Sequence, residues 1–271
     1  MNIGILGAEN SHAKHFCETI NRGNRFPGYR ITHLYAADAP QVGEELARDY
    51  GLTLTDSEDA VIAACDAVVV TYRKGSLHAA PVLRALKAGK AVFNDKPFST
   101  DVEKAAEIVA YAREHQLLVC GGSNLKGLPD IAALKPQITP GATVVITFAA
   151  DPNSEYDGYW FYGIHAAELC LTLCGTDYRD VAAFRTGDTV VATVRFDQVT
   201  CVLVTTPGIQ DLHISINADG KNVAHNVEMA YQSVGPAELV TMLKTGQPPR
   251  DVGFYEAATR LLTDIIKAAG L

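Results

Sequence analysis

The chain has 271 residues, of which 48% are hydrophobic and 20% are charged, and its formal net charge is −8. This composition is typical of one or two globular domains. The acidic balance argues against nucleic acid or an anionic membrane as a partner. No apolar run is long enough to span a bilayer and no signal peptide is recognisable, so we expect a cytoplasmic protein. The six cysteines include no C-x-x-C pair, and we expect thiols without a bound metal.

The first 120 residues alternate short apolar runs with amphipathic segments. Helices that connect successive strands in this way produce a parallel sheet. The sequence Ser99-Thr100-Asp101 is a typical cap for the helix that follows it. The expected strands are 2–6, 29–37, 66–71, 90–93 and 117–120, and the expected helices are 11–21, 41–50, 77–88 and 102–114.

The second half has a different pattern, because several β-rich runs follow one another without helices between them. Such runs, joined by turn sequences, predict an antiparallel sheet. The expected strands are 143–149, 181–185, 190–196, 200–205 and 212–217, with helices at 163–174, 236–244 and 254–269. We therefore predict an α/β fold: a Rossmann-type parallel-sheet domain at 1–124, and a smaller α+β domain with an open antiparallel sheet at 125–271.

A glycine follows the first strand, at the start of the first expected helix. This arrangement suits the phosphates of a dinucleotide, because the first N–H groups of a helix are free to bind an anion. The dinucleotide fingerprint has glycine at two positions and glycine or alanine at a third, and here these are Gly7, Glu9 and His12. Gly7, Asn10, Ser11 and His12 are candidate cofactor-binding residues. Glu9 leaves a second interpretation open: its carboxylate takes the place of the anion, in a Rossmann fold that has lost its ligand.

Asp38 ends the second expected strand. An acid at this place suits the two ribose hydroxyls of NAD and repels the 2′-phosphate of NADP. No arginine or lysine follows closely, so Asp38 favours NAD over NADP as the cofactor. The alternative is that Asp38 only opens the turn before Pro40.

Three further segments carry a family resemblance. The matching residues of segment 66–97 are Thr71, His78, Ala88-Gly89-Lys90, Lys96 and Pro97, with Asp95 where the family has glutamate. Those of segment 122–129 are Gly122, Asn124, Lys126 and Pro129, and those of segment 162–168 are Tyr162, Gly163, His165 and Glu168. In combination, these segments resemble the glucose-fructose oxidoreductase / inositol dehydrogenase (Gfo/Idh/MocA) family.

The resemblance implies hydride transfer between NAD and a hydroxyl-bearing carbon of a sugar, cyclitol or related small molecule. By the family's pattern, Lys96 polarises the substrate oxygen and His165 is the acid/base, so both are candidate catalytic and substrate-binding residues. By the same pattern, domain 125–271 binds the substrate, and its sheet forms the interface of a homodimer or homotetramer. The other candidates are Thr71, His78, Asp95 and Asn124 for the cofactor, and Lys126 and Tyr162 for the substrate.

One departure bears on activity, because Phe161 stands where the family often has an aspartate four residues before the histidine. Glu168, one turn after His165 on the same helix face, is expected to be able to orient the imidazole ring instead. The alternative is a non-catalytic relative that binds a sugar or a nucleotide. Simpler interpretations also stay open: Lys96 as a surface lysine at a strand end, His165 as a histidine packed under the sheet, and His78 as a residue that orders a loop.

Overall fold

The computed structural model describes residues 1–22 and 25–271, and these form two compact units. The first unit comprises Met1–Gly122 together with Gln232–Tyr255, and the second comprises Ser123–Tyr231 together with Glu256–Leu271. Each is described by itself below. Within the described residues, no helix combines the length and the apolar character needed to cross a bilayer.

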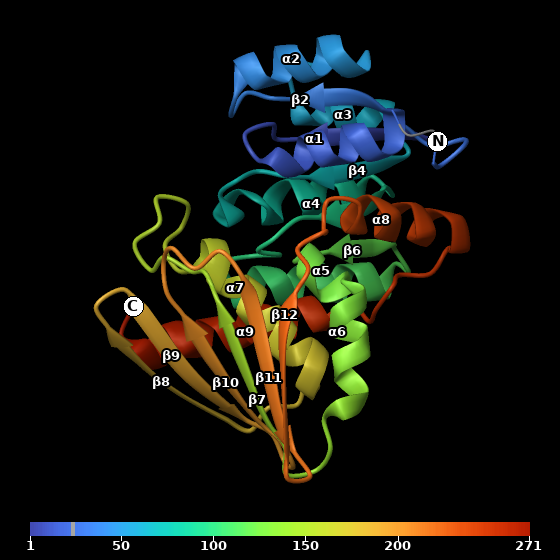
Figure 1. Ribbon diagram of the computed structural model, residues 1–271. Coiled ribbons are helices and arrows are strands. Elements are labelled where there is room, and N and C mark those ends of the chain that lie inside the picture. Colours follow the sequence, from blue (N-terminus) through green and yellow to red (C-terminus); the bar gives the residue numbers. More distant parts are fainter. Residues whose placement is uncertain (23–24) are drawn as a thin grey trace. The chain divides into compact units, whose positions relative to one another are not determined.

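The first unit is built on a parallel sheet of strand order β3-β2-β1-β4-β5-β6 (Figure 1). This is the Rossmann order, in which the chain builds outward from β1 in one direction and then returns to build outward on its other side. The strands are β1 (Asn2–Leu6), β2 (Arg30–Tyr35), β3 (Thr53–Leu54), β4 (Ala67–Val70), β5 (Ala91–Asn94) and β6 (Val119–Gly121). The helices are α1 (Ser11–Cys17), α2 (Pro40–Tyr50), α3 (Glu58–Ala64), α4 (Ala79–Lys87), α5 (Val102–Glu114) and α8 (Val234–Thr245).

The reversal of strand order between β1 and β4 fixes the place of the site. Ligands of open α/β sheets bind outside the carboxyl ends of the strands at such a switch point. Here β1 ends at Leu6 and β4 ends at Val70, and the two strands pair in parallel register. The residues that directly follow these strands, from Gly7 and from Thr71, are therefore brought together by the topology alone.

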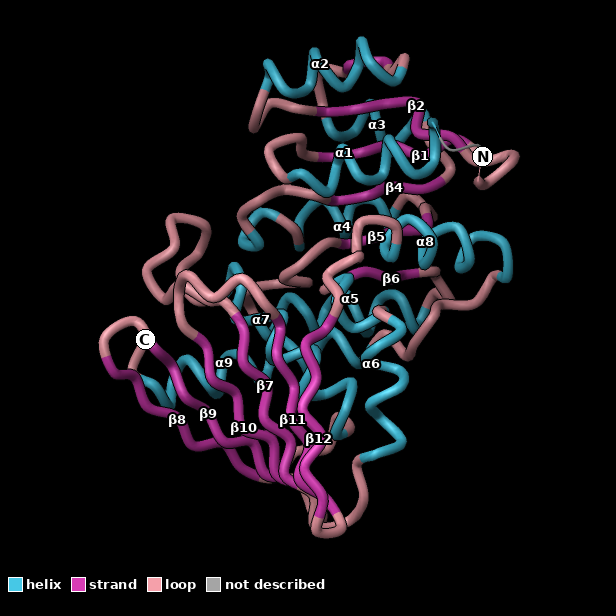
Figure 2. Tube along the Cα trace, in the orientation of Figure 1, coloured by secondary structure: helices cyan, strands magenta, loops and turns pink. Residues whose placement is uncertain are grey.

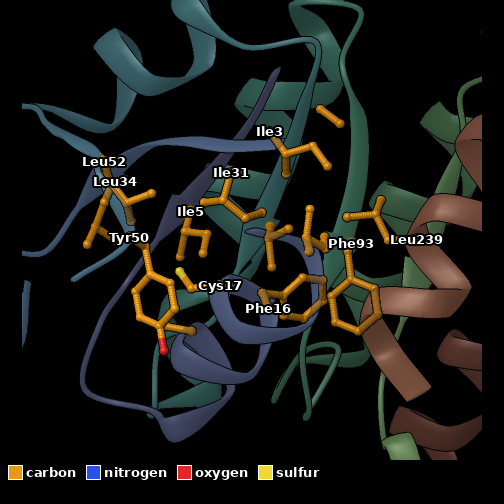
Figure 3. Close-up of a cluster of buried hydrophobic side chains, with 14 of the residues drawn as sticks. Ile3, Ile5, Phe16, Cys17, Ile31, Leu34, Tyr50, Leu52, Phe93 and Leu239 are labelled. Atoms are coloured by element: carbon orange, nitrogen blue, oxygen red, sulfur yellow. The ribbon is translucent and has the colours of Figure 1, made fainter. Parts of the chain in front are cut away.

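Apolar side chains from the strands and helices of the first unit form one core (Figure 3). Ile3 and Ile5 of β1 are fully buried there, beside Phe16 of α1 and Phe93 of β5, whose rings pack edge to face at 4.9 Å. Leu239 of α8 belongs to the same cluster. The late helix α8 thus packs in the first unit, although it lies more than 100 residues after β6.

The second unit is built on a six-stranded sheet of order β12-β11-β7-β10-β9-β8 (Figure 2). The neighbouring pairs are antiparallel except β7–β10, which is parallel. The sheet is therefore mixed. Its strands are β7 (Thr143–Phe148), β8 (Asp180–Thr186), β9 (Thr189–Arg195), β10 (Thr200–Thr205), β11 (Leu212–Ala218) and β12 (Lys221–Val227). The helices are α6 (Pro129–Leu134), α7 (Trp160–Cys174) and α9 (Gly253–Ala269), which belongs to this unit from Glu256 onward.

Alternation along the strands gives this sheet one buried face. Val144 and Ile146 of β7 and Leu203 of β10 are buried, whereas their neighbours along each strand are partly exposed. Helix α7 packs against β7 and β10. Phe184 of β8 is 59% exposed, so part of the sheet presents apolar side chains to solvent within the isolated chain.

The predicted fold class is confirmed: a Rossmann-type parallel sheet comes first and a second, largely antiparallel sheet follows. The element bounds differ from the expected ones by a few residues. The short elements β3, α3 and α6 carried too little pattern to be expected. Strand β12 was not expected either, because its seven residues are largely polar. The parallel pair β7–β10 was also not expected, because closely spaced strands without helices between them predicted an antiparallel sheet.

Candidate active site

The turn after β1 requires glycine at position 7. Gly7 has φ +97°, a conformation that L side chains rarely adopt, and an added Cβ would lie 2.8 Å from the backbone nitrogen of Tyr72. The Thr71 hydroxyl donates to the carbonyl oxygen of Gly7 at 2.8 Å, and the Thr71 amide donates to Leu6. Thr71 is fully buried. The loop after β4 thus holds the turn after β1, and Thr71 lies beside the turn for which cofactor binding was predicted.

Asp38 is bound to the same turn. Its carboxylate accepts hydrogen bonds from the amides of Ala8, at 3.0 and 3.1 Å, and Glu9, at 3.0 Å. The carboxylate that binds these amides is therefore that of Asp38, and not that of Glu9 as the alternative interpretation required. Asp38 is held beside the turn, just after β2, where an acid was predicted to face the ribose.

The start of α1 supplies the remaining donors of the turn. The Asn10 side chain caps the helix by accepting from the His12 amide at 3.1 Å. The amides of Asn10 and Ser11 have no acceptor within the described part of the chain. The residues present therefore fit a dinucleotide: a tight glycine turn, two N–H groups at a helix start, and an anchored acid just after β2.

The two departures at positions 12 and 95 contact each other. The His12 ring nitrogen Nδ1 lies 2.9 and 2.8 Å from the two carboxylate oxygens of Asp95, which is fully buried. Asn10 donates to the same carboxylate at 2.9 Å. Burial alone would raise the pKa of Asp95, but the charge and hydrogen bond of His12, with Lys96, outweigh it and lower that pKa to about 2. Asp95 is thus an ionised carboxylate that links α1 to the end of β5.

Lys96 follows Asp95 and is only 4% exposed, which rules out the interpretation as a surface lysine. Burial lowers its pKa to about 8, against the attraction of Asp95 and with a contribution from the charge of Arg73. A lysine in this state can both donate and accept a proton near neutral pH.

His78 is fully buried at the start of α4. Its Nε2 lies 2.8 Å from the carbonyl oxygen of Tyr72, and burial lowers its pKa. A neutral ring that donates to this carbonyl fixes the loop between β4 and α4. This geometry favours the interpretation of His78 as a residue that orders the loop.

The candidate residues of the second unit gather where the segment after β6 meets α7. His165 is buried, its Nδ1 lies 2.6 Å from the Ser123 hydroxyl oxygen, and its ring packs edge to face on Phe148 at 5.7 Å. The ring of Tyr162 lies 5.3 Å from that of His165 and is 39% exposed. Ser123 was missed from the sequence, since nothing in its neighbourhood distinguishes it from a loop residue.

Glu168 does not have the role that we expected for it. Its carboxylate accepts from the Ser123 amide at 2.9 Å and lies 3.1 Å from the Lys126 ammonium, and both charged side chains are fully buried. The expectation that Glu168 orients the His165 ring was wrong, because the carboxylate faces this amide and this ammonium. Lys126 also donates to the Ser123 carbonyl at 2.8 Å, so the predicted substrate-binding lysine is engaged within its own segment.

Asn124, predicted to contact the cofactor, is 3% exposed, and its Oδ1 has no hydrogen-bond partner among the described residues. A buried carbonyl oxygen without a partner is costly, and a ligand that donates to it would remove that cost. The first unit thus holds Gly7, Asn10, Ser11, His12, Asp38, Thr71, His78, Asp95 and Lys96, and the second holds Asn124, Lys126, Tyr162 and His165.

Comparison with known proteins identifies the first unit. Residues 1–123 match the sequence model of the Gfo/Idh/MocA family, described as an oxidoreductase family with an NAD-binding Rossmann fold. The N-terminal part of the chain is therefore similar to proteins of the Gfo/Idh/MocA family. An uncharacterized oxidoreductase of Streptococcus pneumoniae serotype 4 is 28% identical over 115 residues, which cover 42% of this chain and 30% of that protein.

Solved structures extend the likeness to the whole length of the chain. The myo-inositol dehydrogenase of Corynebacterium glutamicum has a TM-score of 0.83 at 16% identity, over 100% of this chain and 96% of that one. GenD2 of gentamicin A biosynthesis, solved in complex with NAD, has a TM-score of 0.85 at 16% identity, over 100% and 94% of the two chains. These likenesses establish that both units share the fold of these enzymes.

Proposed function

We propose that the chain is an NAD-dependent oxidoreductase that transfers a hydride between nicotinamide and a hydroxyl-bearing carbon of a sugar, cyclitol or related small molecule. The observation that carries the proposal is the buried Lys96, at the end of β5 in a unit that is similar to an NAD-binding oxidoreductase family. The structural likeness to a myo-inositol dehydrogenase supports this substrate class.

Five groups would hold the cofactor. The turn at Gly7 would receive the phosphates, and the amides of Asn10 and Ser11 are available to them. Asp38 would bind the adenosine ribose, and its negative charge at this place favours NAD over NADP. The Asn124 oxygen would accept a hydrogen bond from the ligand. When bound, the nicotinamide supplies the hydride acceptor or donor.

The chain's own residues would manage the proton. Hydride leaves a carbon readily only as the hydroxyl on that carbon loses its proton, so a base must lie within hydrogen-bond reach. His165 would accept this proton, and the positively charged form of Lys96 would stabilise the developing alkoxide. Burial lowers the pKa of Lys96 to about 8, so a substantial share of the lysine stays protonated at neutral pH.

Replacing Lys96 with Met tests the proposal. The wild-type chain is incubated with NAD+ and a panel of myo-inositol, alditols and aldoses, and reduced nicotinamide is followed by absorbance. We expect turnover with a member of the panel, a Lys96→Met variant at least about 100-fold slower, and NADH binding retained. Full activity in the variant would refute the role of Lys96.

A non-catalytic relative is the second candidate, and the turn after β1 is the observation that favours it. Two of its amides are taken by Asp38, and positions 9 and 12 hold glutamate and histidine. A titration of the chain with NADH separates the two candidates. No binding at about 1 mM cofactor favours the second, and binding by a Glu9→Gly variant would then identify the acidic side chain as the cause.

We further propose that the chain forms a homodimer or homotetramer through the sheet of the second unit. Phe184, which is 59% exposed, and Val223, which is 36% exposed, lie on strands of this sheet. Light scattering coupled to size exclusion tests this proposal. The wild-type chain should have the mass of a dimer or a tetramer, and Phe184→Asp should lower that mass. A wild-type chain with the mass of a monomer would refute the proposal.

A further inference from the structure

The hydrogen bond between Ser123 and His165 was not predicted, because Ser123 is not among the predicted site residues. Ser123 lies directly before the short turn that contains Asn124, and its side chain is fully buried. The 2.6 Å separation between its hydroxyl oxygen and Nδ1 of His165 is that of a good hydrogen bond. The same hydroxyl oxygen accepts from the Leu125 amide at 3.2 Å. The contact joins a residue of the loop after β6 to a residue on α7.

A histidine held through one ring nitrogen has its reactive nitrogen defined. When Nδ1 is bound to a fixed partner, the ring cannot rotate freely, and Nε2 is the nitrogen left to exchange a proton. A serine hydroxyl can accept from Nδ1–H, which is required when Nε2 is a base and also when the ring is doubly protonated. The same hydroxyl can donate to Nδ1 when the neutral ring carries its proton on Nε2. Ser123 can therefore stay bonded in each protonation state of His165.

The position of Ser123 is itself fixed by a buried ion pair. Its amide donates to the Glu168 carboxylate at 2.9 Å, and its carbonyl accepts from the Lys126 ammonium at 2.8 Å. Glu168 and Lys126 lie 3.1 Å apart and both are fully buried. The serine backbone is thus bound on both its polar groups, so its hydroxyl has a defined place relative to α7, which carries both Glu168 and His165.

The aspartate that often supports the family's histidine is replaced here by Phe161. We propose that Ser123 takes over this task as a positioning residue, which holds Nδ1 of His165 and leaves Nε2 to exchange the substrate proton. The contact is a property of the second unit alone, and its effect on turnover rests on the proposed function. Glu168 and Lys126 act one step further out, because they fix the backbone of Ser123.

Nitrogen NMR of the imidazole rings tests the contact without any substrate. Long-range ¹⁵N–¹H correlation spectra of the full chain give the Nδ1 and Nε2 shifts, and a His165→Gln variant identifies the His165 signals among the eight histidines. We expect Ser123→Ala to move both nitrogen shifts toward the averaged values of a ring that exchanges between tautomers. Ser123→Thr should retain the wild-type pattern. Identical His165 shifts in wild type and Ser123→Ala would overturn the proposal.

Two further variants keep the test decisive. Ser123→Cys preserves the side-chain volume and weakens the hydrogen bond, so it reports on the contact if Ser123→Ala fails to fold. Ser57→Ala, which removes the hydroxyl that caps α3 in the first unit, is the matched control and should leave the His165 signals unchanged. A Ser57→Ala spectrum that changes as Ser123→Ala does would show a general loss of stability and overturn the proposal.

Turnover of NAD+ with the alcohol that the wild-type chain oxidises tests the consequence. Ser123→Ala should lower kcat about 10- to 100-fold with KM nearly unchanged, since misplacing a reacting group by about 1 Å has effects of this size. Ser123→Thr should recover most of the loss. If His165→Gln keeps full activity, the proposed role of His165 fails while the NMR contact stands. If His165→Gln is inactive and Ser123→Ala is not slowed, the positioning role fails.

Discussion

Removing the Lys126 ammonium should destabilise the second unit strongly. Lys126 and Glu168 are both fully buried, at 3.1 Å, and the second carboxylate oxygen of Glu168 has no partner among the described residues. Without the ammonium, the Ser123 amide would be the one remaining partner of the buried carboxylate among residues 1–22 and 25–271. Breaking a buried ion pair from one side typically costs about 3–5 kcal/mol. We expect Lys126→Met to lose stability of this order, a fall in Tm of roughly 5–15 °C.

Urea unfolding followed by tryptophan fluorescence measures this loss in the right unit, because Trp160, the sole tryptophan, begins α7. A double variant, Lys126→Met with Glu168→Gln, carries no uncompensated charge and should recover most of the loss. Arg179→Met is the control, since it breaks the exposed Arg179–Asp197 pair, and it should leave the midpoint near wild type. A loss below about 1 kcal/mol for Lys126→Met, the size found for exposed pairs, would refute the reasoning.

Three other predictions follow from single sites. Burial lowers the pKa of Lys96 from 10.5 to about 8, so the unfolded chain binds more protons than the folded chain between pH 8 and pH 10.5. The free energy of unfolding should therefore rise by about 3 kcal/mol across this pH range, and urea midpoints should show the rise in wild type and not in Lys96→Met. Gly7→Ala should cost more stability than Gly89→Ala, because both have positive φ but only the Cβ at position 7 meets other atoms within 4 Å; equal thermal shifts would contradict this. Asp38→Ala should weaken NADH binding in fluorescence titrations and reduce the ratio of the affinity for NADH to that for NADPH. An unchanged ratio would remove Asp38 from the proposed ribose site.

The pattern of the sequence predicted the architecture well where segments were long or periodic. The strand that contains Val68, Val69 and Val70 is apolar throughout and is buried on both faces as β4. Two-residue β3 has no detectable period. Helix α8 was predicted as a helix, but its packing with Phe93 and Ile3 in one core depends on contacts between residues far apart in the chain.

The candidate site was predictable at the motif level and not at the level of contacts. Gly7, Asp38 and Lys96 follow strands, and strand order alone places such residues at one edge of the sheet. The hydrogen-bond partner of His165 was not predictable from the sequence, because Glu168, one helical turn away, lies much closer to His165 in the chain than Ser123 does. Glu168 binds the Ser123 backbone instead, and the hydroxyl of Ser123 reaches the ring.

The contact between His12 and Asp95 illustrates the same limit. In the sequence, His12 and Asp95 are two separate departures from the expected motifs, and Glu9 is a third that is expected to disturb phosphate binding more. The structure pairs His12 with Asp95 at 2.8 Å and gives the amides of the turn to Asp38. Two substitutions that weaken a motif in sequence thus form one buried, hydrogen-bonded contact in space.

Titration of the intact chain with NADH, followed by fluorescence and calorimetry, tests the central proposal most directly. The account predicts saturable binding below about 1 mM, stoichiometric with the chain and weakened by Asp38→Ala. Absence of saturation at that concentration, in wild type and in Glu9→Gly alike, would contradict the assignment of this chain as an NAD-dependent oxidoreductase.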